Sequence, residues 1–533
     1  MELEAFAASD DRQKGQQEII NSAANQASVN STEQAKEIKA AQAQANSQKH
    51  ARENEQLLKS LQEVQLIAQQ AQEAAKKAQD QVEVLELKLN QSQERSQRSA
   101  QDGNQKIAEV ADKLKQIDEG VKKVAEAFDG LTISGQITAI YQTSSVKMRQ
   151  GDLRDSSGAD LTGSDLTDHS HKTGASTLSA NIGIDKKLDE NERLHFDLQF
   201  ANGLGVDGNL QGGAMVNNDV MQDANNPDEV YLAKAFYEGV VKLPSEFALT
   251  VNVGKFGVND YFDVGAENSD QTKQFLNQAV ANNGAFDYVQ DLQGHGYTYG
   301  TRFGLANELI GFDFAYFSSD NTLDNIRDKY SLVGGITLTP TWGEDLKGVY
   351  QFYTFSNRGE YAAFDGEGNL VTKDVAAINT KDNADTLTKS GFGFSLTQAL
   401  SDKINVFGKY GKQDDDRDVR HYQDMDESIM FGGNISGKFW KRENDKVGIA
   451  YEIGKLTGNH KKAHEKGYES FFDRSGGIGA GNYADERVFE IYYNYGITEH
   501  TNVSLDFQHI SNFYYSKVIG AQRFAAVRLN SSF

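Results

Sequence analysis

The final residues of the chain alternate between apolar and polar positions. Counting back in steps of two places Phe533, Ser531, Leu529, Val527 and Ala525 on one face, and Asn530, Arg528, Ala526 and Gln522 on the other. This period predicts a β-strand with one apolar and one wet face. A membrane-spanning barrel strand and a half-buried strand of a soluble sheet both satisfy it. The rest of the chain must therefore decide between the two classes.

The same alternation recurs from Leu131 to the C-terminus and predicts sixteen strands. The first carries Ile133, Ile137 and Tyr141 on its apolar face. Short turns follow the even-numbered strands, and longer polar loops follow most of the odd-numbered ones. The predicted strands cover about 131–141, 176–187, 193–203, 229–242, 247–257, 295–305, 309–318, 329–340, 346–356, 388–399, 403–413, 427–440, 446–457, 485–497, 502–512 and 518–533.

The lengths of the connections indicate which class of sheet this is. Long loops are predicted notably at 146–175, 204–228, 258–294, 357–387 and 458–484. Short turns at one end and long loops at the other are typical of outer-membrane barrels, whose short turns face the periplasm. An even strand number also places both barrel termini on that side. We therefore predict an all-β transmembrane barrel of sixteen antiparallel strands over 131–533.

The segment before the barrel has a helical pattern instead. Its apolar positions follow a 4-3-4-3 spacing from Leu57 to Leu89, and a second run extends from Ile107 to Phe128. This spacing predicts a left-handed coiled coil, whose oligomer state the Ala-rich seam leaves open. A packed bundle helix is the alternative, but no Gly/Pro turn lets the helix fold back. The predicted seam includes Leu57, Leu61, Val64, Val82, Leu85, Leu89, Ile107, Leu114, Ile117 and Val121.

These patterns divide the chain into three parts. Residues 1–50 have poor heptads and are expected to be weakly helical or disordered. Residues 51–130 form a stalk and 131–533 the barrel. No basic and apolar leader follows Met1, so we expect the numbering to begin near the mature end of an exported protein.

Composition supports the barrel and excludes some functions. The chain has no Cys, three Pro and 49 Gly, together with 22 Tyr and 29 Phe. Few prolines suit strands whose N–H groups must be paired, and many aromatic rings suit the girdles at membrane interfaces. The formal charge of −23 argues against nucleic-acid binding, which needs a basic face. The sequence contains no run of 18 or more apolar residues, so no transmembrane helix is predicted.

No catalytic motif is found, and we predict that the protein is not an enzyme. Neither HExxH nor a Gly-x-Ser-x-Gly elbow at a strand–helix junction occurs. His169 and His171 lie near Asp165 and Asp168 in a polar loop, and residues 414–418 are rich in Asp. Either group has a spacing that could bind a metal, but solvation of a polar loop is the favoured interpretation. No metal and no cofactor are predicted.

The alternation assigns charged side chains to the barrel lumen. Mixed charges there can orient water and sugar hydroxyls, or simply form salt bridges along the wall. The predicted lumen residues are His195, Asp197, Lys234, Glu238, Arg302, Asp313, Lys409, Glu490, Asp506 and Arg528.

One loop carries a resemblance to a known family. Residues 254–263 read GlyLysPheGlyValAsnAspTyrPheAsp, 274–288 read GlnPheLeuAsnGlnAlaValAlaAsnAsnGlyAlaPheAspTyr, and 296–300 read GlyTyrThrTyrGly. This order of motifs resembles the carbohydrate-selective porin (OprB) family. The resemblance implies that 258–294 folds into the barrel and narrows the pore, and the short apolar run from Phe275 suits a segment packed against a wall.

The resemblance also implies which residues form the constriction. Polar groups of the loop are expected to line it, and aromatic rings are expected to stack on sugar faces. Some of the acids are expected to anchor the loop to Arg302 or Lys255. The expected constriction residues are Asp260, Phe262, Asp263, Phe275, Asn277, Asn282, Phe286, Asp287, Tyr288 and Arg302.

Two functions follow from this reading. The first is a trimeric outer-membrane porin for passive diffusion of small hydrophilic solutes, with sugars as the expected substrates and the stalk as trimer clamp and periplasmic spacer. The second is mainly a structural tether to the cell wall. The stalk resembles those of wall-tethering porins of diderm bacteria, although no S-layer-homology module precedes it.

Expected partners are outer-membrane lipids, lipopolysaccharide and the barrel-assembly machinery, which would recognise Phe533 as its signal. Peptidoglycan is a further candidate. Solute selectivity cannot be read from the sequence.

Overall fold

The computed structural model describes most of the chain from residue 129 onward. The gaps are 145–173, 204, 207–229, 245, 290–295, 321–322, 344, 372–384, 419–424, 469–480 and 518–520. Before residue 129 it describes only scattered helical positions between residues 73 and 120. The chain divides into two units, Met1–Ala127 and Phe128–Phe533.

The described positions of the first unit are helical and mostly exposed. Ile117 is the one predicted seam residue among them, and its side chain is half-buried. The other seam residues lie outside the described residues, so the coiled coil stays a prediction. Among the residues that the structure describes, no helix combines the length and apolar character needed to cross a membrane.

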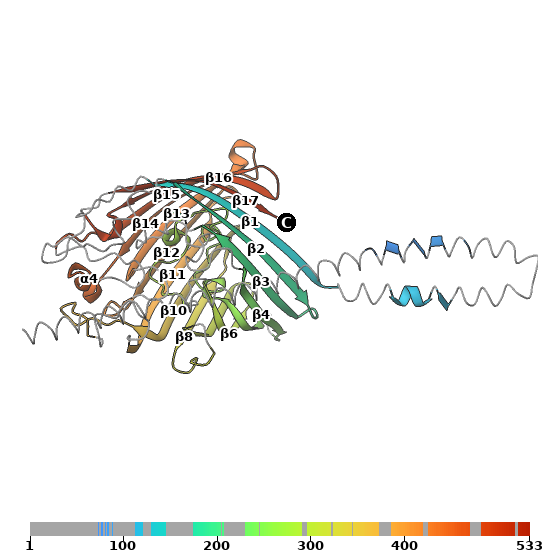
Figure 1. The fold of residues 1–533 in the computed structure, drawn as a ribbon, viewed down its shortest axis with the longest axis horizontal. Helices are drawn as coiled ribbons and strands as arrows, with labels where there is room; N and C mark the ends of the chain where they lie inside the picture. The colour runs from blue at the N-terminus through green and yellow to red at the C-terminus, as the bar shows by residue number, and fades with distance from the viewer. Residues whose placement is uncertain are drawn as a thin grey trace, which may run out of the picture. The chain divides into compact units, whose positions relative to one another are not determined.

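The second unit is a closed antiparallel barrel of sixteen wall strands (Figure 1). Each strand pairs with the next along the chain, β8 pairs with β10, and β1 pairs with β17 to close the sheet. This confirms the predicted fold of 131–533. The wall strands are β1 Leu131–Ser144, β2 Gly174–Lys187, β3 Glu192–Asn202, β4 Val230–Lys242, β5 Ala248–Gly257, β6 Tyr297–Ala306, β7 Ile310–Ser318, β8 Tyr330–Leu338, β10 Leu346–Tyr361, β11 Asp385–Ala399, β12 Ile404–Gln413, β13 Glu427–Ser436, β14 Lys446–Lys455, β15 Glu486–Gly496, β16 Thr501–Ser511 and β17 Gln522–Ser532.

Several strand boundaries differ from the predictions by two to five residues, including the ends of β8, β10 and β13. The strand predicted to end at residue 340 stops at Leu338, and the two-residue strand β9 (Thr341–Trp342) resumes pairing with β10. Pro340 lies between them and has no N–H to give to the ladder, which explains the break. The strand predicted over 427–440 ends at Ser436, where the 3-10 helix η6 (Gly437–Trp440) begins. Strand β10 extends five residues beyond its predicted end at 356, to Tyr361.

The two faces of the wall differ as the alternation predicts. On β1, Ile133, Ile137 and Tyr141 are exposed on the outer face, whereas Thr138 and Gln142 are buried on the inner face. An apolar exposed exterior is what a lipid environment requires, because only alternate residues meet the hydrocarbon.

The C-terminal residue lies where the barrel closes. The backbone N–H of Phe533 donates to the carbonyl of Gly135 at 2.9 Å, and the Gly135 N–H donates back at 3.2 Å. A Cβ at Gly135 would lie 2.3 Å from the Phe533 ring, so a glycine is needed beneath it. The ring itself remains 79% exposed. Its role as an assembly signal stays a prediction.

Candidate functional site

The connection from β5 to β6 fills part of the barrel interior. We call its described part, residues 258–289, the inner segment; it contains the 3-10 helix η4 (Val258–Asp260) and the short helix α3 (Gln278–Ala281). From Phe275 to Val289 every side chain is buried. The segment contacts residues on the inner faces of β1, β10 and β12–β17, so its described part lies inside the barrel.

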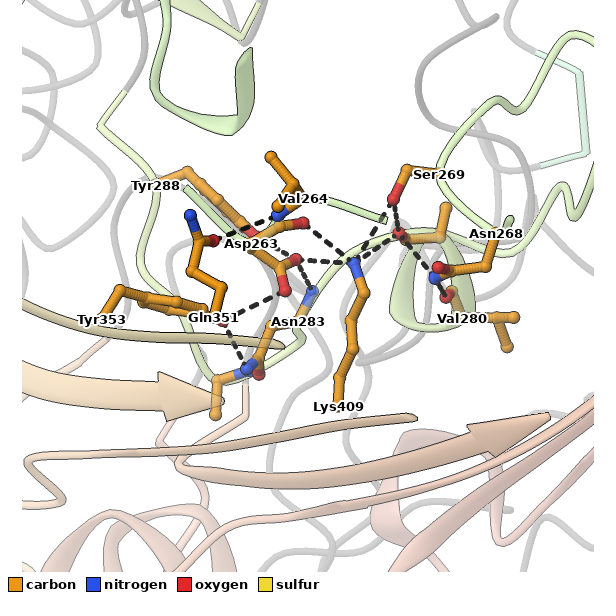
Figure 2. A network of polar contacts seen from close by, with 12 residues as sticks. Asp263, Val264, Asn268, Ser269, Val280, Asn283, Tyr288, Gln351, Tyr353 and Lys409 are labelled. Atoms are coloured by element: carbon orange, nitrogen blue, oxygen red, sulfur yellow. Dashed lines mark hydrogen bonds and ion pairs between the residues drawn. The ribbon is translucent and has the colours of Figure 1, made fainter. Parts of the chain in front are cut away.

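The first attachment of the inner segment is an ion pair with strand β12 (Figure 2). The Lys409 ammonium donates to the Asp263 carboxylate at 2.8 Å, and both side chains are almost fully buried. It also donates to Ser269 Oγ at 3.3 Å and to the carbonyl of Ala281 at 2.9 Å. One buried cation thus holds three separated parts of the segment together.

The Asp263 carboxylate is further satisfied by the segment and by strand β10. It accepts hydrogen bonds from the Asn283 N–H at 2.7 Å, the Tyr288 hydroxyl at 2.5 Å and the Tyr353 hydroxyl at 3.1 Å. Asp263 has a left-handed backbone with φ 58°, a conformation that Asp tolerates better than most residues. Several hydrogen bonds to an ionised group are what its burial requires.

The approach of the segment to the wall depends on a glycine of β12. The Asn283 amide donates to the Tyr410 carbonyl at 2.9 Å and to the Tyr353 hydroxyl at 2.7 Å. A Cβ at Gly411 would lie 2.2 Å from Asn283 Oδ1. Only glycine leaves room for this side chain at that position.

The second attachment uses strands β15 and β16. The Glu490 carboxylate accepts from the backbone N–H groups of Leu276 at 2.5 Å and Asn277 at 3.1 Å. The Asn277 side chain caps α3 by accepting from the Ala279 N–H at 3.0 Å and donates to Gln508 on β16 at 3.1 Å. A wall carboxylate therefore fixes the position at which the helix begins.

The third attachment lies at the barrel seam. The Arg528 guanidinium on β17 is fully buried and donates to the carbonyls of Gln271 at 2.5 Å and Gln274 at 2.7 Å. On β1, the Gln136 amide donates to Thr272 Oγ1 at 2.9 Å. The segment is thus bonded to both strands that close the barrel.

Further contacts hold its two ends. Glu267 accepts from Asn434 at 2.8 Å and from Lys446 at 2.9 Å. The Asp287 carboxylate accepts from the Tyr361 hydroxyl at 2.9 Å, which uses the unpredicted extension of β10.

The aromatic side chains of Phe262, Phe275, Phe286 and Tyr288 in the inner segment are packed and buried. Phe286 stacks on Tyr353 with ring centroids 4.9 Å apart, and Phe275 meets Tyr492 edge to face at 4.8 Å. Phe262 and Tyr288 join the cluster around Phe286. Buried rings contribute packing energy, and they offer no open face on which a sugar could stack.

The opposite wall carries charged side chains that remain partly exposed. We call this row on the inner faces of β2–β7 the charged ladder. Arg193 donates to Glu238 at 2.7 Å and to Asp185 at 3.1 Å. His195 lies 2.9 Å from Asp185 and 3.1 Å from Asp197. Groups of both signs therefore lie side by side along the row.

The ladder continues to β6 and β7, where it meets the inner segment. Arg302 donates to Asp313 at 2.8 Å and to Asn252 at 2.9 Å, and its guanidinium lies 4.0 Å from the Tyr261 ring centroid. Lys234 pairs with Asp260 at 2.6 Å. Lys234, Lys409 and Lys446 therefore pair with the acids Asp260, Asp263 and Glu267 of the segment. Burial, followed by the charge of the adjacent Asp260, raises the pKa of Tyr261 to about 12, so its hydroxyl stays protonated.

The structure thus sorts the predicted site residues into two groups. The ladder contains one group: His195, Lys234, Glu238, Arg302 and Asp313 are partly open to the interior, Asp197 is buried beside His195, and Asp260 faces them. The other group is buried where the inner segment meets the wall or its own core: Lys409, Glu490, Asp506, Arg528, Phe262, Asp263, Phe275, Asn277, Asn282, Phe286, Asp287 and Tyr288.

Sequence reasoning omitted several ladder and attachment residues. Asp185 and Arg193 lie on the same face as His195, so the alternation could have found them. Tyr261 and Glu267 gave no comparable signal, because they lie outside the strands and their partners are distant in the sequence.

The two groups of candidate metal ligands, residues 165–171 and 414–418, lie outside the inner segment and the charged ladder. Residues 165–171 lie outside the described residues. In the loop after β12, Arg417 pairs with Asp416, Asp415 accepts from Thr457 at 2.8 Å and Asp418 accepts from Tyr468 at 2.7 Å. Within the described ranges, no group of three or more His, Cys, Asp or Glu could hold a metal ion.

Two solved structures are similar to this chain, and the first of them supports the fold. The high-pH structure of Pseudomonas putida OprB matches with a TM-score of 0.55 and 14% identity, covering 78% of this chain and 97% of that chain. The outer-membrane channel DcaP of Acinetobacter baumannii matches at a TM-score of 0.42 and 9% identity, covering 76% and 97%.

Comparison with curated proteins finds no significant match. The model of the carbohydrate-selective porin, OprB family, matches residues 188–533. This range covers more than half of the chain and includes the inner segment, its three attachments and most of the charged ladder. The chain therefore belongs to the OprB family of carbohydrate-selective porins.

Proposed function

We propose that the barrel is a diffusion pore for small hydrophilic solutes, with sugars preferred, and that solutes pass between the inner segment and the charged ladder. One observation carries this proposal. The charged side chains Arg193, Lys234, Glu238 and Arg302 remain partly exposed on the inner faces of β3, β4 and β6, whereas Lys409, Glu490 and Arg528 on the far wall are covered by the segment. Among the described residues, a polar surface with charges of both signs is therefore left along the charged ladder.

The constriction in this proposal lies where the segment meets the ladder. Asp260 and Tyr261 face Lys234 and Arg302 there. Fixed charges of both signs can orient water and sugar hydroxyls without holding one ion tightly, which suits a pore that must release its solute. The packed rings of Phe275 and Phe286 have a supporting role in this view, because they keep the segment rigid.

Liposome swelling tests the solute preference. Proteoliposomes would be placed in isotonic solutions of neutral sugars, amino acids or anionic solutes of matched size. Sugars should enter fastest, and Arg302→Gln should change the relative rates. A barrel that conducts no ions in planar bilayers would contradict the pore proposal.

The stalk is proposed as trimer clamp and periplasmic spacer, on the support of the heptad spacing from Leu57 to Leu89. Deletion of residues 1–128 should leave conducting barrels that no longer stay trimeric in mild detergent. The tether alternative predicts a different result. Pull-down with cell-wall fragments and the distance between envelope layers would both change in the deletion strain, and unchanged values would reject the tether.

A further inference from the structure

The turn between β13 and β14 differs from every other short turn of the barrel. Residues 437–445 read GlyLysPheTrpLysArgGluAsnAsp and carry a net positive charge. The turns at 188–191, 243–247, 307–309 and 497–500 each carry net negative charge instead. This contrast occurs in a chain whose overall charge is −23.

The turn has a fixed conformation. Ser436 caps η6 by accepting from the Lys438 N–H at 3.3 Å. The buried Asp445 carboxylate accepts from Arg442 at 2.7 Å, from Trp440 at 3.2 Å and from the Gly496 N–H at 3.0 Å. These bonds tie both arms of the turn to β15, so the side chains at its tip are presented by a rigid frame.

The tip combines an apolar ring with cations. The Phe439 side chain is 55% exposed, and the Lys403 ammonium of the neighbouring turn lies 5.3 Å from its ring centroid. Lys438 lies 3.8 Å from Asp402, a loose and exposed pair, and Lys441 is exposed as well. An exposed pair at this distance contributes little, so the lysine can exchange its partner for a stronger anion.

The outer wall beside the turn is aliphatic. Ile435 precedes the turn on β13 and Ile449 follows it on β14, and both are exposed on the outer face. Ile404 pairs with Ile435 across the ladder to β12. A strip of aliphatic side chains therefore leads to a cluster of lysines at the membrane boundary. Such a surface is complementary to an amphiphile with an anionic head and hydrocarbon tails.

We propose that the β12–β14 face binds an anionic phospholipid of the periplasmic leaflet. Its phosphate group lies among Lys403, Lys438 and Lys441, Phe439 inserts beneath the headgroup, and an acyl chain runs along Ile435 and Ile449. Short turns face the periplasm in barrels of this class, so the lipid comes from that leaflet. Juxtamembrane lysines attract anionic headgroups in just this position. The proposal does not depend on which solute passes through the pore.

Native mass spectrometry of the purified full chain tests the proposal. The probes are phosphatidylglycerol and phosphatidylcholine with identical acyl chains. The wild-type chain should retain phosphatidylglycerol at least tenfold better, and K403Q/K438Q/K441Q should lose most of that preference. The control K187Q/K242Q/K347Q removes the same charge from the ends of β2, β4 and β10, beside other short turns, and should keep the preference for phosphatidylglycerol.

Three results would overturn the proposal. The first is an equal loss of preference in the two triple variants. The second is displacement of the lipid by glycerol 1-phosphate at equal concentration, which would identify a site for a soluble phosphate. The third is a phosphatidylglycerol occupancy in Phe439→Ala equal to that of the wild type. The Phe439→Ala measurement keeps the proposal falsifiable should the triple lysine variant fail to fold, and the unheated gel mobility of each variant reports folding.

Discussion

Replacement of Lys409 by Met should release the inner segment while leaving the wall intact. The ammonium lost in this variant contacts Asp263, Ser269 and Ala281, all of them in the segment. Met fills a similar volume on β12, so the wall itself loses little packing. What remains is a buried carboxylate whose cation has gone.

The magnitude follows from that carboxylate. Removal of one partner of a buried ion pair costs about 3–5 kcal/mol. Asp263 keeps three hydrogen bonds, from Asn283, Tyr288 and Tyr353, which places the cost near the lower limit. A cost of about 3 kcal/mol borne by the segment alone shifts its docked-to-undocked ratio by roughly 100-fold.

Single-channel recording in planar bilayers measures this shift. The variant should show frequent transitions to higher conductance, and limited proteolysis should cut within residues 264–289. Lys389→Met is the matched control, because Lys389 on β11 is as deeply buried and contacts only the carbonyls of Asp414 and Arg417 and the carboxylate of Asp426 in the outer loops. In the double variant Asp263→Asn/Lys409→Met the transitions to higher conductance should be less frequent than in Lys409→Met alone. Identical recordings from Lys409→Met and the wild type would refute the reasoning.

Three further predictions concern the turn, the glycine and the ladder. Burial alone would raise the pKa of Asp445, but hydrogen bonds from Arg442, Tyr493 and Trp440 lower it to about 2, from an unfolded value near 4. The ionised Asp445 therefore contributes about 2 kcal/mol to the free energy of unfolding above pH ~4, and this contribution is lost as the pH falls towards 2. The difference in heat-unfolding midpoint between the wild type and Asp445→Asn should disappear over that range. A difference of unchanged size at pH 2 would contradict this prediction. Gly411→Ala should displace Asn283, lower the free energy of unfolding by about 1–3 kcal/mol and raise the noise of the single-channel current. Gly334→Ala is the control and should behave as the wild type, because its Cβ would meet nothing closer than 3.9 Å. Arg302→Gln leaves Asp313 without its cation, so the reversal potential in a KCl gradient should shift towards cation preference, and a shift towards anions would reject the assignment of Arg302 to the pore.

The wall could be predicted from the sequence because its determinants are local. Each strand alternates between two environments, so the pattern on β1 or β17 needs no knowledge of distant residues. The same pattern identified Lys409 and Arg528 as inward-facing. It could not show that a segment more than 100 residues away in the sequence covers them. Alternation identifies the face of the sheet on which a side chain lies, but not what packs against that face.

The site was predictable only in part for the same reason. The motif resemblance indicated that the β5–β6 connection folds inward, but the roles of its rings depend on packing against Tyr353, Phe407 and Tyr492 from three other strands. The end of β13 at Ser436 likewise depends on Asp445, whose bonds to Arg442 and Gly496 form only when the turn closes against β15.

The contacts of the inner segment with both seam strands have a consequence for assembly. Thr272 accepts from Gln136 on β1, while Gln271 and Gln274 accept from Arg528 on β17. A barrel closed two residues out of register would move these donors apart by roughly 7 Å along the strands, since each residue advances about 3.4 Å. Arg528 would then be a buried cation without acceptors, at a cost of several kcal/mol. The inner segment therefore fits only a cylinder whose first and last strands have paired in the native alignment, so its docking reports correct closure of the barrel.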